Sequence, residues 1–226
     1  MRFTILTLHP DVFPGPLASS ILGRAIAAGA VQVDVADIRR HGIGKHRAVD
    51  DTPYGGGPGM VLRVDVVAAA IEEVHTPGCR VVLLSAGAPR FDQAAARRLA
   101  AVPHLVLVCG HYEGVDARVA QVVDEELSIG DFVVTGGELP SLLVLDAVAR
   151  LLPGVLGNPA SVADESFSGP LLEYPQYTRP RAWRGHEVPA VLVSGNHGAI
   201  EAWRTTAARE RTRRLRPDLA PGETED

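Results

Sequence analysis

Residues 1–157 alternate short apolar runs with amphipathic stretches, and this alternation restricts the possible folds more than any other feature of the sequence. Each run is nearly continuous and rich in β-branched residues, which is typical of strands buried on both faces of a parallel sheet. The predicted strands are Phe3–Leu8, Val31–Ile38, Arg80–Leu84, Leu105–Cys109 and a shorter one at Phe132–Thr135. We therefore expect an α/β fold, with a mostly parallel sheet and helices on both of its faces.

The stretches between these runs have helical periodicity. They are Ser20–Ala28, Asp65–Val74, Asp92–Ala101 and Pro140–Leu152. Asp65 and Asp92 stand where N-caps belong, because their carboxylates can accept hydrogen bonds from free backbone N–H groups. Pro140 suits a first helical turn, where its missing N–H leaves no hydrogen bond unmade.

The pattern changes after Leu152. Residues 153–159 contain prolines and glycines that end the alternation, and the next twenty or so positions are polar and rich in turn residues. We expect residues 158–175 to form a flexible linker. Residues 176–226 then make a small helical domain, with one long helix at Asn196–Arg216.

Charge and composition exclude several classes of protein. The formal net charge is −5 at pH 7, so a nucleic-acid partner would need a local basic patch and not a basic surface throughout. Cys79 and Cys109 both stand beside apolar runs, and we expect them to be buried free thiols in a reducing compartment. His41 and His46 have no partner ligands at metal-site spacing, so no metal site is predicted.

The sequence also argues against a membrane protein. Its first apolar run stops at His9-Pro10, too short for a signal-peptide core, and none of the runs approaches the length of a membrane span. We expect a soluble, cytoplasmic protein with no membrane partner.

The segment Asp50–Met60 reads Asp-Asp-Thr-Pro-Tyr-Gly-Gly-Gly-Pro-Gly-Met, which predicts a loop. It is either a flexible surface loop or a loop whose bare backbone approaches a ligand. It lacks the G-x-G-x-x-G pattern of a dinucleotide-binding turn. It is not a phosphate-binding P-loop either, because His46 follows Gly44-Lys45 where that motif needs Ser or Thr.

Two further segments follow predicted strands, at the edge of the sheet where open α/β folds bind ligands. Cys109–Asp116, which reads Cys-Gly-His-Tyr-Glu-Gly-Val-Asp, offers an aromatic ring and carboxylates, although a purely structural turn fits it equally well. Leu127–Pro140 holds glycines around a short apolar run and leads directly into a helix. Such a backbone can wrap a flat ring such as adenine.

Six strings in this chain resemble the tRNA (guanine-N1)-methyltransferase family, in the family's order and at its spacing. They are DDTPYGGGPGM, CGHYEGVD, SIGDFVVTGGELP, PGVLGNPAS, YTRP and PAVLVSGNH. The resemblance extends from Leu8 to Pro217. It implies a homodimeric enzyme of the SPOUT class, whose catalytic domain (residues 1–157 here) is tied in a trefoil knot. It also implies S-adenosylmethionine as the methyl donor and guanine 37 of tRNA as the acceptor, a modification that supports reading-frame maintenance.

The resemblance assigns the donor site to three loops. Carried over position by position, the predicted donor-binding residues are Leu84, Ser85, Gly110, Tyr112, Glu113, Ile129, Gly130, Asp131, Phe132, Val133, Val134, Gly136, Gly137 and Pro140. The first loop departs from the family's Ser-Pro-x-Gly pattern, because it reads Ser85-Ala-Gly-Ala88 here. Ala86 therefore lacks the fixed backbone angle that proline would supply.

Methylation at N1 of guanine has a clear chemical requirement. The neutral base carries a proton on N1, so a carboxylate must remove it, and a cation beside O6 would stabilise the charge that develops there. The resemblance assigns the cation to Arg150, which could instead pair with Asp146 on the same helix. The family's base is an aspartate followed by Ser-Phe. Glu165 stands in that slot here and Asp164 precedes it, so both are candidate bases.

The predicted tRNA contacts lie in two regions of the chain. They are His46, Arg47 and Tyr54 around the glycine-rich loop, and Tyr177, Thr178, Arg179, Arg204, Arg211 and Arg214 in the C-terminal part. The arginine-rich helix suits phosphate contacts, although Glu201 and Glu210 also allow a solvated helix face. The expected partner is an anticodon stem-loop with guanine at positions 36 and 37. A divalent ion is compatible with this chemistry but is not indicated by the sequence.

Two other classes of function remain as alternatives. A Rossmann-like dinucleotide enzyme shares the strand–helix alternation but would need the missing glycine pattern. An RNA-binding protein that has lost catalysis would keep the arginine helix, and the departures at Ala86 and Glu165 are compatible with it. Methylation of a tRNA transcript distinguishes the enzyme from both.

Overall fold

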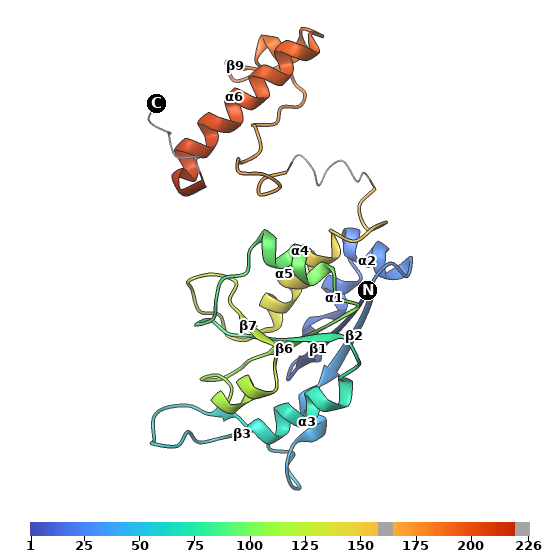
Figure 1. Ribbon diagram of the computed structural model, residues 1–226, viewed down its shortest axis with the longest axis vertical. Coiled ribbons are helices and arrows are strands. Elements are labelled where there is room, and N and C mark those ends of the chain that lie inside the picture. Colours follow the sequence, from blue (N-terminus) through green and yellow to red (C-terminus); the bar gives the residue numbers. More distant parts are fainter. Residues whose placement is uncertain (158–164, 220–226) are drawn as a thin grey trace. The chain divides into compact units, whose positions relative to one another are not determined.

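The computed structural model describes residues 1–157 and 165–219. The chain divides into two compact units, Met1–Gly157 and Asn158–Asp226, each of which is described by itself (Figure 1).

A five-stranded sheet forms the centre of the first unit. Its strands are β1 (Arg2–Thr7), β2 (Gln32–Asp37), β5 (Cys79–Leu84), β6 (His104–Cys109) and β7 (Glu125–Leu127). They are ordered β2-β1-β6-β5-β7, and every neighbouring pair is parallel. The central strand β6 is buried at every position, which explains its unbroken apolar run. The predicted parallel α/β fold is confirmed.

The fifth strand is not where we expected it. The prediction placed it at Phe132–Thr135, but these residues form an exposed loop in which Val133 is 85% exposed. The strand is instead β7, whose sequence Glu-Glu-Leu does not resemble a buried strand. It lies at the edge of the sheet, where Glu125 forms ion pairs with Arg80 and Arg98. These ion pairs lower the pKa of Glu125, since its charged form is the one they stabilise.

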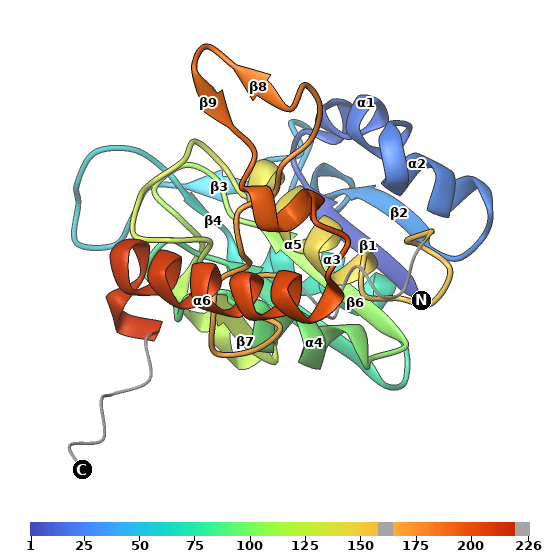
Figure 2. The same ribbon diagram turned by 90° about the horizontal axis from the view of Figure 1, so that it is seen from above.

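Helices cover both faces of this sheet (Figures 1 and 2). One buried cluster packs α2 (Ser20–Ala27), α4 (Gln93–Ala100) and α5 (Glu138–Ala149) against one face. A second cluster packs α3 (Val64–Val74) against the other. The remaining elements are α1 (Pro14–Leu17), the 3₁₀ turns η1 (Pro10–Val12), η2 (Ile38–His41) and η3 (Ala117–Gln121), and the antiparallel pair β3 (Asp50–Asp51) and β4 (Val61–Leu62).

The helix caps were predicted with mixed success. Asp92 caps α4 by accepting a hydrogen bond from the backbone N–H of Ala95. Pro140 lies in the first turn of α5, as expected. Asp65 is not the N-cap of α3, because the helix begins one residue earlier, after Arg63. The carboxylate of Asp65 pairs instead with the guanidinium of Arg63, at 2.7 Å.

The second unit is small. It consists of the hairpin β8 (Ala182–Trp183) and β9 (His186–Glu187), the 3₁₀ turn η5 (Ala190–Val193), the long helix α6 (His197–Leu215) and the short turn η6 (Pro217–Leu219). Asn196 caps α6 by accepting from the N–H of Ala199. Thr212 is buried and joins the helix to the preceding segment, because its hydroxyl accepts from the N–H of Leu172 at 2.9 Å.

The structure also bears on the expectations for the cysteines and for membrane-spanning helices. Cys109 is buried and Cys79 is half-buried, and both are free thiols. In residues 1–157 and 165–219, none of the helices has the length and apolar character needed to cross a membrane. The trefoil knot stays a prediction.

Candidate functional site

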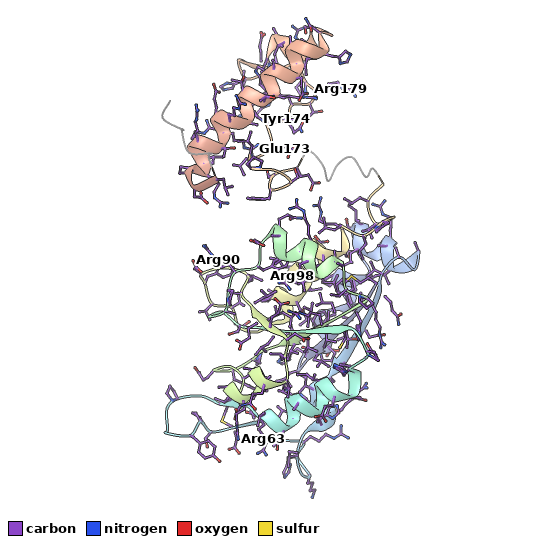
Figure 3. All side chains as sticks on the ribbon, in the orientation of Figure 1. Arg63, Arg90, Arg98, Glu173, Tyr174 and Arg179 are labelled. Carbon is purple, nitrogen blue, oxygen red and sulfur yellow. The ribbon has the colours of Figure 1, made fainter. Side chains whose placement is uncertain are left out.

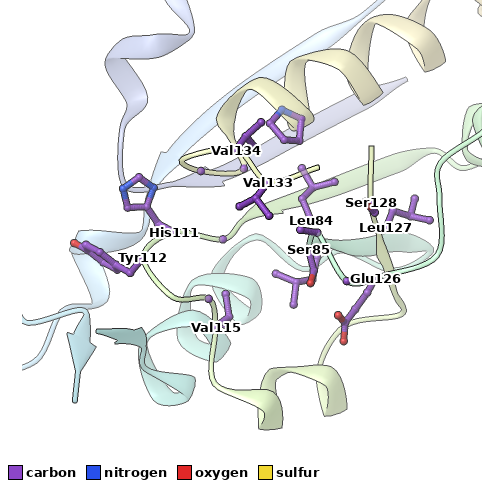
Figure 4. A pocket seen from close by; sticks show the side chains of 18 of the residues that line it. Leu84, Ser85, His111, Tyr112, Val115, Glu126, Leu127, Ser128, Val133 and Val134 are labelled. Atoms are coloured by element: carbon purple, nitrogen blue, oxygen red, sulfur yellow. The ribbon is translucent and has the colours of Figure 1, made fainter. Parts of the chain in front are cut away.

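A cavity of about 690 Å³ lies at the carboxyl ends of β5, β6 and β7 (Figure 4). Three loops enclose it, namely residues 84–87, residues 110–117 and residues 126–137. Ligands of open α/β sheets bind at this edge. The cavity is therefore the principal candidate site in the described part of the first unit.

Most of the predicted donor-site residues line this cavity. They are Leu84, Ser85, Gly110, Tyr112, Glu113, Ile129, Phe132, Val133, Val134, Gly136, Gly137 and Pro140. Gly130 and Asp131 do not line it. Asp131 points to solvent and lies 3.5 Å from Arg90, whereas Gly130 (φ +150°) leaves room for the ring of Phe132.

Backbone hydrogen bonds hold the three loops together. The N–H of Ser85 donates to the carbonyl of Leu127 at 3.0 Å, which joins the first loop to the third. The N–H of Gly137 donates to the carbonyl of Gly110 at 2.8 Å, which joins the third loop to the second. These contacts are made by the backbone, so they fix the spacing of the cavity walls without using side-chain hydrogen bonds.

Two glycines are required by close packing. A Cβ on Gly137 would lie 2.5 Å from the Cα of Cys109 and 2.9 Å from the nitrogen of Gly110, closer than real side chains approach backbone. A Cβ on Gly136 would collide with the side chains of His111 and Glu138. The pair of glycines therefore lets the start of α5 pack against the end of β6.

A buried polar group beside Gly136 and Gly137 was not predicted from the sequence. Glu138 is 7% exposed, and its Oε1 accepts a 2.7 Å hydrogen bond from the hydroxyl of Thr7. Its Oε2 lies 4.0 Å from Nδ1 of His111, which lines the cavity. The ring of His111 in turn meets the edge of the Tyr112 ring, with 4.9 Å between centroids. The only signal in the sequence was an acid directly after the Gly-Gly pair.

Carboxylates give the cavity an acidic lining. Glu113, Asp116 and Glu126 all border it. Hydrogen bonds from the side chain and the backbone N–H of Arg118 lower the pKa of Asp116 to about 2, so its charge is retained at neutral pH. In the described residues, His, Cys, Asp and Glu side chains do not gather in groups of three or more that could hold a metal ion.

The glycine-rich loop is attached to the second wall of the cavity. The N–H of Glu113 donates to the carbonyl of Met60, and the N–H of Leu62 donates to the carbonyl of Gly114, both at 3.0 Å. A Cβ on Gly59 (φ +80°) would collide with the side chain of Glu113. The loop is thus anchored at one end, while its tip at Tyr54 is fully exposed.

Comparison with known proteins shows the family to which this chain belongs. The family model described as tRNA (Guanine-1)-methyltransferase TrmD matches residues 1–222. The chain belongs to the tRNA (guanine-N1)-methyltransferase family. Family membership implies a tRNA substrate and S-adenosylmethionine as the methyl donor.

Curated members of the tRNA (guanine-N1)-methyltransferase family are similar to this chain over nearly its whole length. The tRNA (guanine-N(1)-)-methyltransferase of Anaeromyxobacter sp. (strain Fw109-5) is 58% identical over 223 residues, which are 97% of this chain and 90% of that protein. The corresponding protein of Desulforudis audaxviator (strain MP104C) is 56% identical over 97% of this chain and 89% of its own length. That of Geobacter sulfurreducens (strain ATCC 51573 / DSM 12127 / PCA) is 54% identical over 97% and 91%.

The residues predicted to act on guanine lie in different units of the chain. Arg150 is the half-buried C-cap residue directly after α5, and its backbone N–H donates to the carbonyl of Asp146. Glu165 is half-buried at the start of the described part of the second unit. Its carbonyl accepts hydrogen bonds from both the N–H and the hydroxyl of Ser168. Asp164 lies outside the described residues.

The residues predicted to bind tRNA differ in exposure. His46 and Arg47 lie in an exposed turn, and Thr178, Arg179 and Arg214 are exposed in the second unit. Tyr177 is 48% exposed. Two of the predicted arginines contact Glu173 and Tyr174, which are labelled in Figure 3. Arg204 lies over the ring of Tyr174, and Arg211 donates to the carbonyl of Glu173 at 3.1 Å.

Proposed function

We propose that this protein transfers a methyl group from S-adenosylmethionine to N1 of guanine 37 in tRNA, in the cytoplasm, and so supports reading-frame maintenance. The cavity at the carboxyl edge of the sheet carries this proposal. Its size is within the range of small-molecule sites. It also gathers residues from all three segments that the family resemblance assigns to the donor.

The walls of the cavity fit the chemistry of the donor. S-adenosylmethionine carries a flat adenine and two positive charges, one on sulfur and one on its amino group. Backbone N–H and C=O groups of the glycine-containing loops suit the edge of the adenine, and the apolar side chains of Ile129 and Val134 suit its faces. The carboxylates of Glu113, Asp116 and Glu126 suit the positive charges. When bound, the donor supplies an electrophilic methyl group.

The side chains outside the cavity supply the acceptor chemistry. Glu165 is the proposed base that removes the N1 proton of guanine, with Asp164 as its alternative. Arg150 is the proposed cation beside O6, where negative charge develops as the proton leaves. Both groups act on the base itself, so each must reach an unstacked guanine, and an anticodon loop offers one at modest cost.

An exposed apolar surface supports a homodimer. Leu139 and Leu143 lie one helical turn apart on α5 and are 64% and 47% exposed. Leu143 also borders a groove lined by Pro16 and Ile21 from the first two helices. An apolar surface at the start of α5, directly beside the donor cavity, suits a second copy of the chain.

Methylation of a defined transcript tests the proposed function. A tRNA transcript with guanine at positions 36 and 37 should accept a labelled methyl group and yield 1-methylguanine on digestion. The matched control is the same transcript with adenine at position 37, which should stay unlabelled. Label at another position, or at another atom of guanine 37, would disprove the proposal.

A further inference from the structure

The β8–β9 hairpin of the second unit is absent from the predicted tRNA contacts. Figure 2 shows it extending away from α6. Its antiparallel ladder places Ala182 opposite Glu187 and Trp183 opposite His186. Every residue from 181 to 187 is exposed. The hairpin therefore contributes almost nothing to the core of its own unit, and its side chains need another explanation.

One face of the hairpin combines an aromatic ring with cationic side chains. Trp183 and His186 are cross-strand partners and share a face, and Arg181 lies on that face because it is two residues before Trp183. The indole of Trp183 is 58% exposed, although tryptophan is usually well buried. Residues 179–186 include three arginines and no acid.

The turn places a further cation over this ring. Arg184 and Gly185 form the two-residue turn, and both have positive φ (49° and 81°). Glycine, asparagine or aspartate would adopt this conformation more easily than arginine. The guanidinium of Arg184 nevertheless lies 4.7 Å from the centroid of the Trp183 ring. An arginine held above an exposed indole is suited to a ligand that has both a flat ring and a negative charge.

Unpaired nucleotides are such ligands. Proteins that bind single-stranded nucleic acid stack bases on aromatic side chains and arginine planes while other cations contact the phosphates. We propose that the face formed by Arg181, Trp183, Arg184 and His186 stacks an unpaired base of the tRNA substrate and neutralises an adjacent phosphate. This inference rests on the proposed function, because it takes a tRNA as the partner.

Tryptophan fluorescence of the full-length protein tests the stacking directly. The chain has two tryptophans, so Trp203→Phe leaves Trp183 as the sole reporter, and Trp183→Phe leaves Trp203. Saturating tRNA should quench the emission of the Trp183 reporter strongly and change that of the Trp203 reporter little. Polyglutamate, an anionic polymer without bases, should not quench either. Equal quenching by polyglutamate, or none by tRNA, would overturn the stacking.

Binding measurements separate the ring from the charges. Trp183→Ala should weaken tRNA binding about 10-fold without changing its salt dependence, because stacking releases no counterions. Arg184→Gln should flatten the plot of log affinity against log salt by about one unit. The matched control is Arg24→Gln, an exposed arginine of the first unit, which should leave both quantities unchanged.

The outcomes distinguish this inference from the function on which it rests. If the transcript is bound and methylated while Trp183→Ala and Arg184→Gln both bind it as tightly as the parent, the hairpin inference is wrong and the proposed function stands. If the parent protein neither binds nor methylates the transcript, both are wrong.

Discussion

The hydroxyl of Thr7 donates a 2.7 Å hydrogen bond to Oε1 of Glu138, and both side chains are buried. Thr7 ends β1 and Glu138 begins α5, so this bond joins elements that lie 131 residues apart in the sequence. The same hydroxyl accepts from the backbone N–H of His9 at 2.9 Å. The wall of the cavity at Gly136 and Gly137 is therefore held by a buried polar contact behind it.

Removal of the Thr7 hydroxyl should lower the stability of the first unit. Thr7→Val leaves a buried carboxylate oxygen and a backbone N–H without their partner, which costs about 1–3 kcal/mol for a buried group. Thr7→Ser keeps the hydroxyl and should recover much of the loss. The control is Thr206→Val, which removes an exposed hydroxyl that bonds to its own helix. Urea unfolding measures all three, and equal losses in Thr7→Val and Thr206→Val would contradict the prediction.

A single added methyl group at Gly137 should damage the cavity proposed to hold the donor. Gly137→Ala places a Cβ against the backbone of Cys109 and Gly110, so β6 and α5 must separate. Overpacking of this kind costs about 1–3 kcal/mol, and donor affinity measured by calorimetry should fall with it. Gly87→Ala is the stability control, because a Cβ there meets nothing within 4 Å. An unchanged melting temperature in Gly137→Ala would contradict the prediction, because it would show that β6 and α5 accommodate the Cβ without loss of stability.

Much of the fold could be predicted because the sheet is buried on both faces. β5 and β6 are apolar at all but one position each, and β1 is buried at every position after its first, so local sequence indicates these strands. In β2, at the edge of the sheet, three of the six residues are apolar, and the valines alternate with polar residues. β7 could not be found in this way, because Glu125 pairs with arginines that approach only in three dimensions and Glu126 borders the cavity. Phe132–Thr135 was mistaken for a strand because its apolar side chains line or flank a cavity, not a core.

The candidate site also has one part that the sequence indicates and another that it does not. Glycine-rich segments mark the cavity, since their spacing is local and depends on backbone conformation. The contact between Thr7 and Glu138 could not be predicted, because the two residues are 131 positions apart and the acid after the Gly-Gly pair does not indicate its partner. The N-cap predicted at Asp65 failed for a different, local reason, because Arg63 two residues earlier pairs with its carboxylate.

Stability should depend on pH through His104. This residue is 4% exposed, and its two ring nitrogens lie 2.9 Å and 2.7 Å from the hydroxyls of Thr4 and Thr76. Burial, and then the positive charge of Arg2, lower the pKa of His104 below its ordinary 6.5. The unfolded chain then binds more protons just below pH 6.5, so the free energy of unfolding should fall as the pH decreases through that value.

Substitution of His104 provides the test. In His104→Gln, the slope of unfolding free energy against pH should become flatter below pH 6.5, where the parent protein loses stability. His46→Gln, the same change at an exposed position, should keep the slope of the parent. A parent protein whose stability is constant or rises on acidification below pH 6.5 would contradict the assignment to His104.

Two arginines of α6 should affect tRNA binding differently. Arg214 is exposed, so Arg214→Gln should reduce the salt dependence of binding by about one unit, as the loss of one phosphate contact does. Arg211 donates to the carbonyl of Glu173, so Arg211→Gln should lower the stability of the second unit. Salt titrations of binding and urea unfolding together separate these effects. Equal salt slopes for Arg214→Gln and the parent protein would favour a solvated helix face.

Glu165 stands where the family resemblance places an aspartate, and its proposed role as the base can be tested by rate. The turn from Glu165 to Ser168 is closed by two hydrogen bonds to the carbonyl of Glu165, and the hydroxyl of Ser166 accepts from the N–H of Glu173. These bonds involve no atom of the Glu165 carboxylate. Substitution of that side chain should therefore remove the base while these hydrogen bonds can still form.

We expect Glu165→Ala to lower the single-turnover rate of methylation by about 10²- to 10⁴-fold, the usual contribution of a positioned base, while donor affinity stays near that of the parent. Glu165→Gln has nearly the same shape but cannot accept the proton, so it should be equally slow. Glu165→Asp should retain most of the rate, because aspartate has a similar intrinsic pKa and the family uses it. Asp164→Ala is the neighbouring control and should cost little. If Asp164→Ala is the slow variant and Glu165→Ala is not, the base is one residue earlier; if neither is slow, the proton is removed by a group outside this segment.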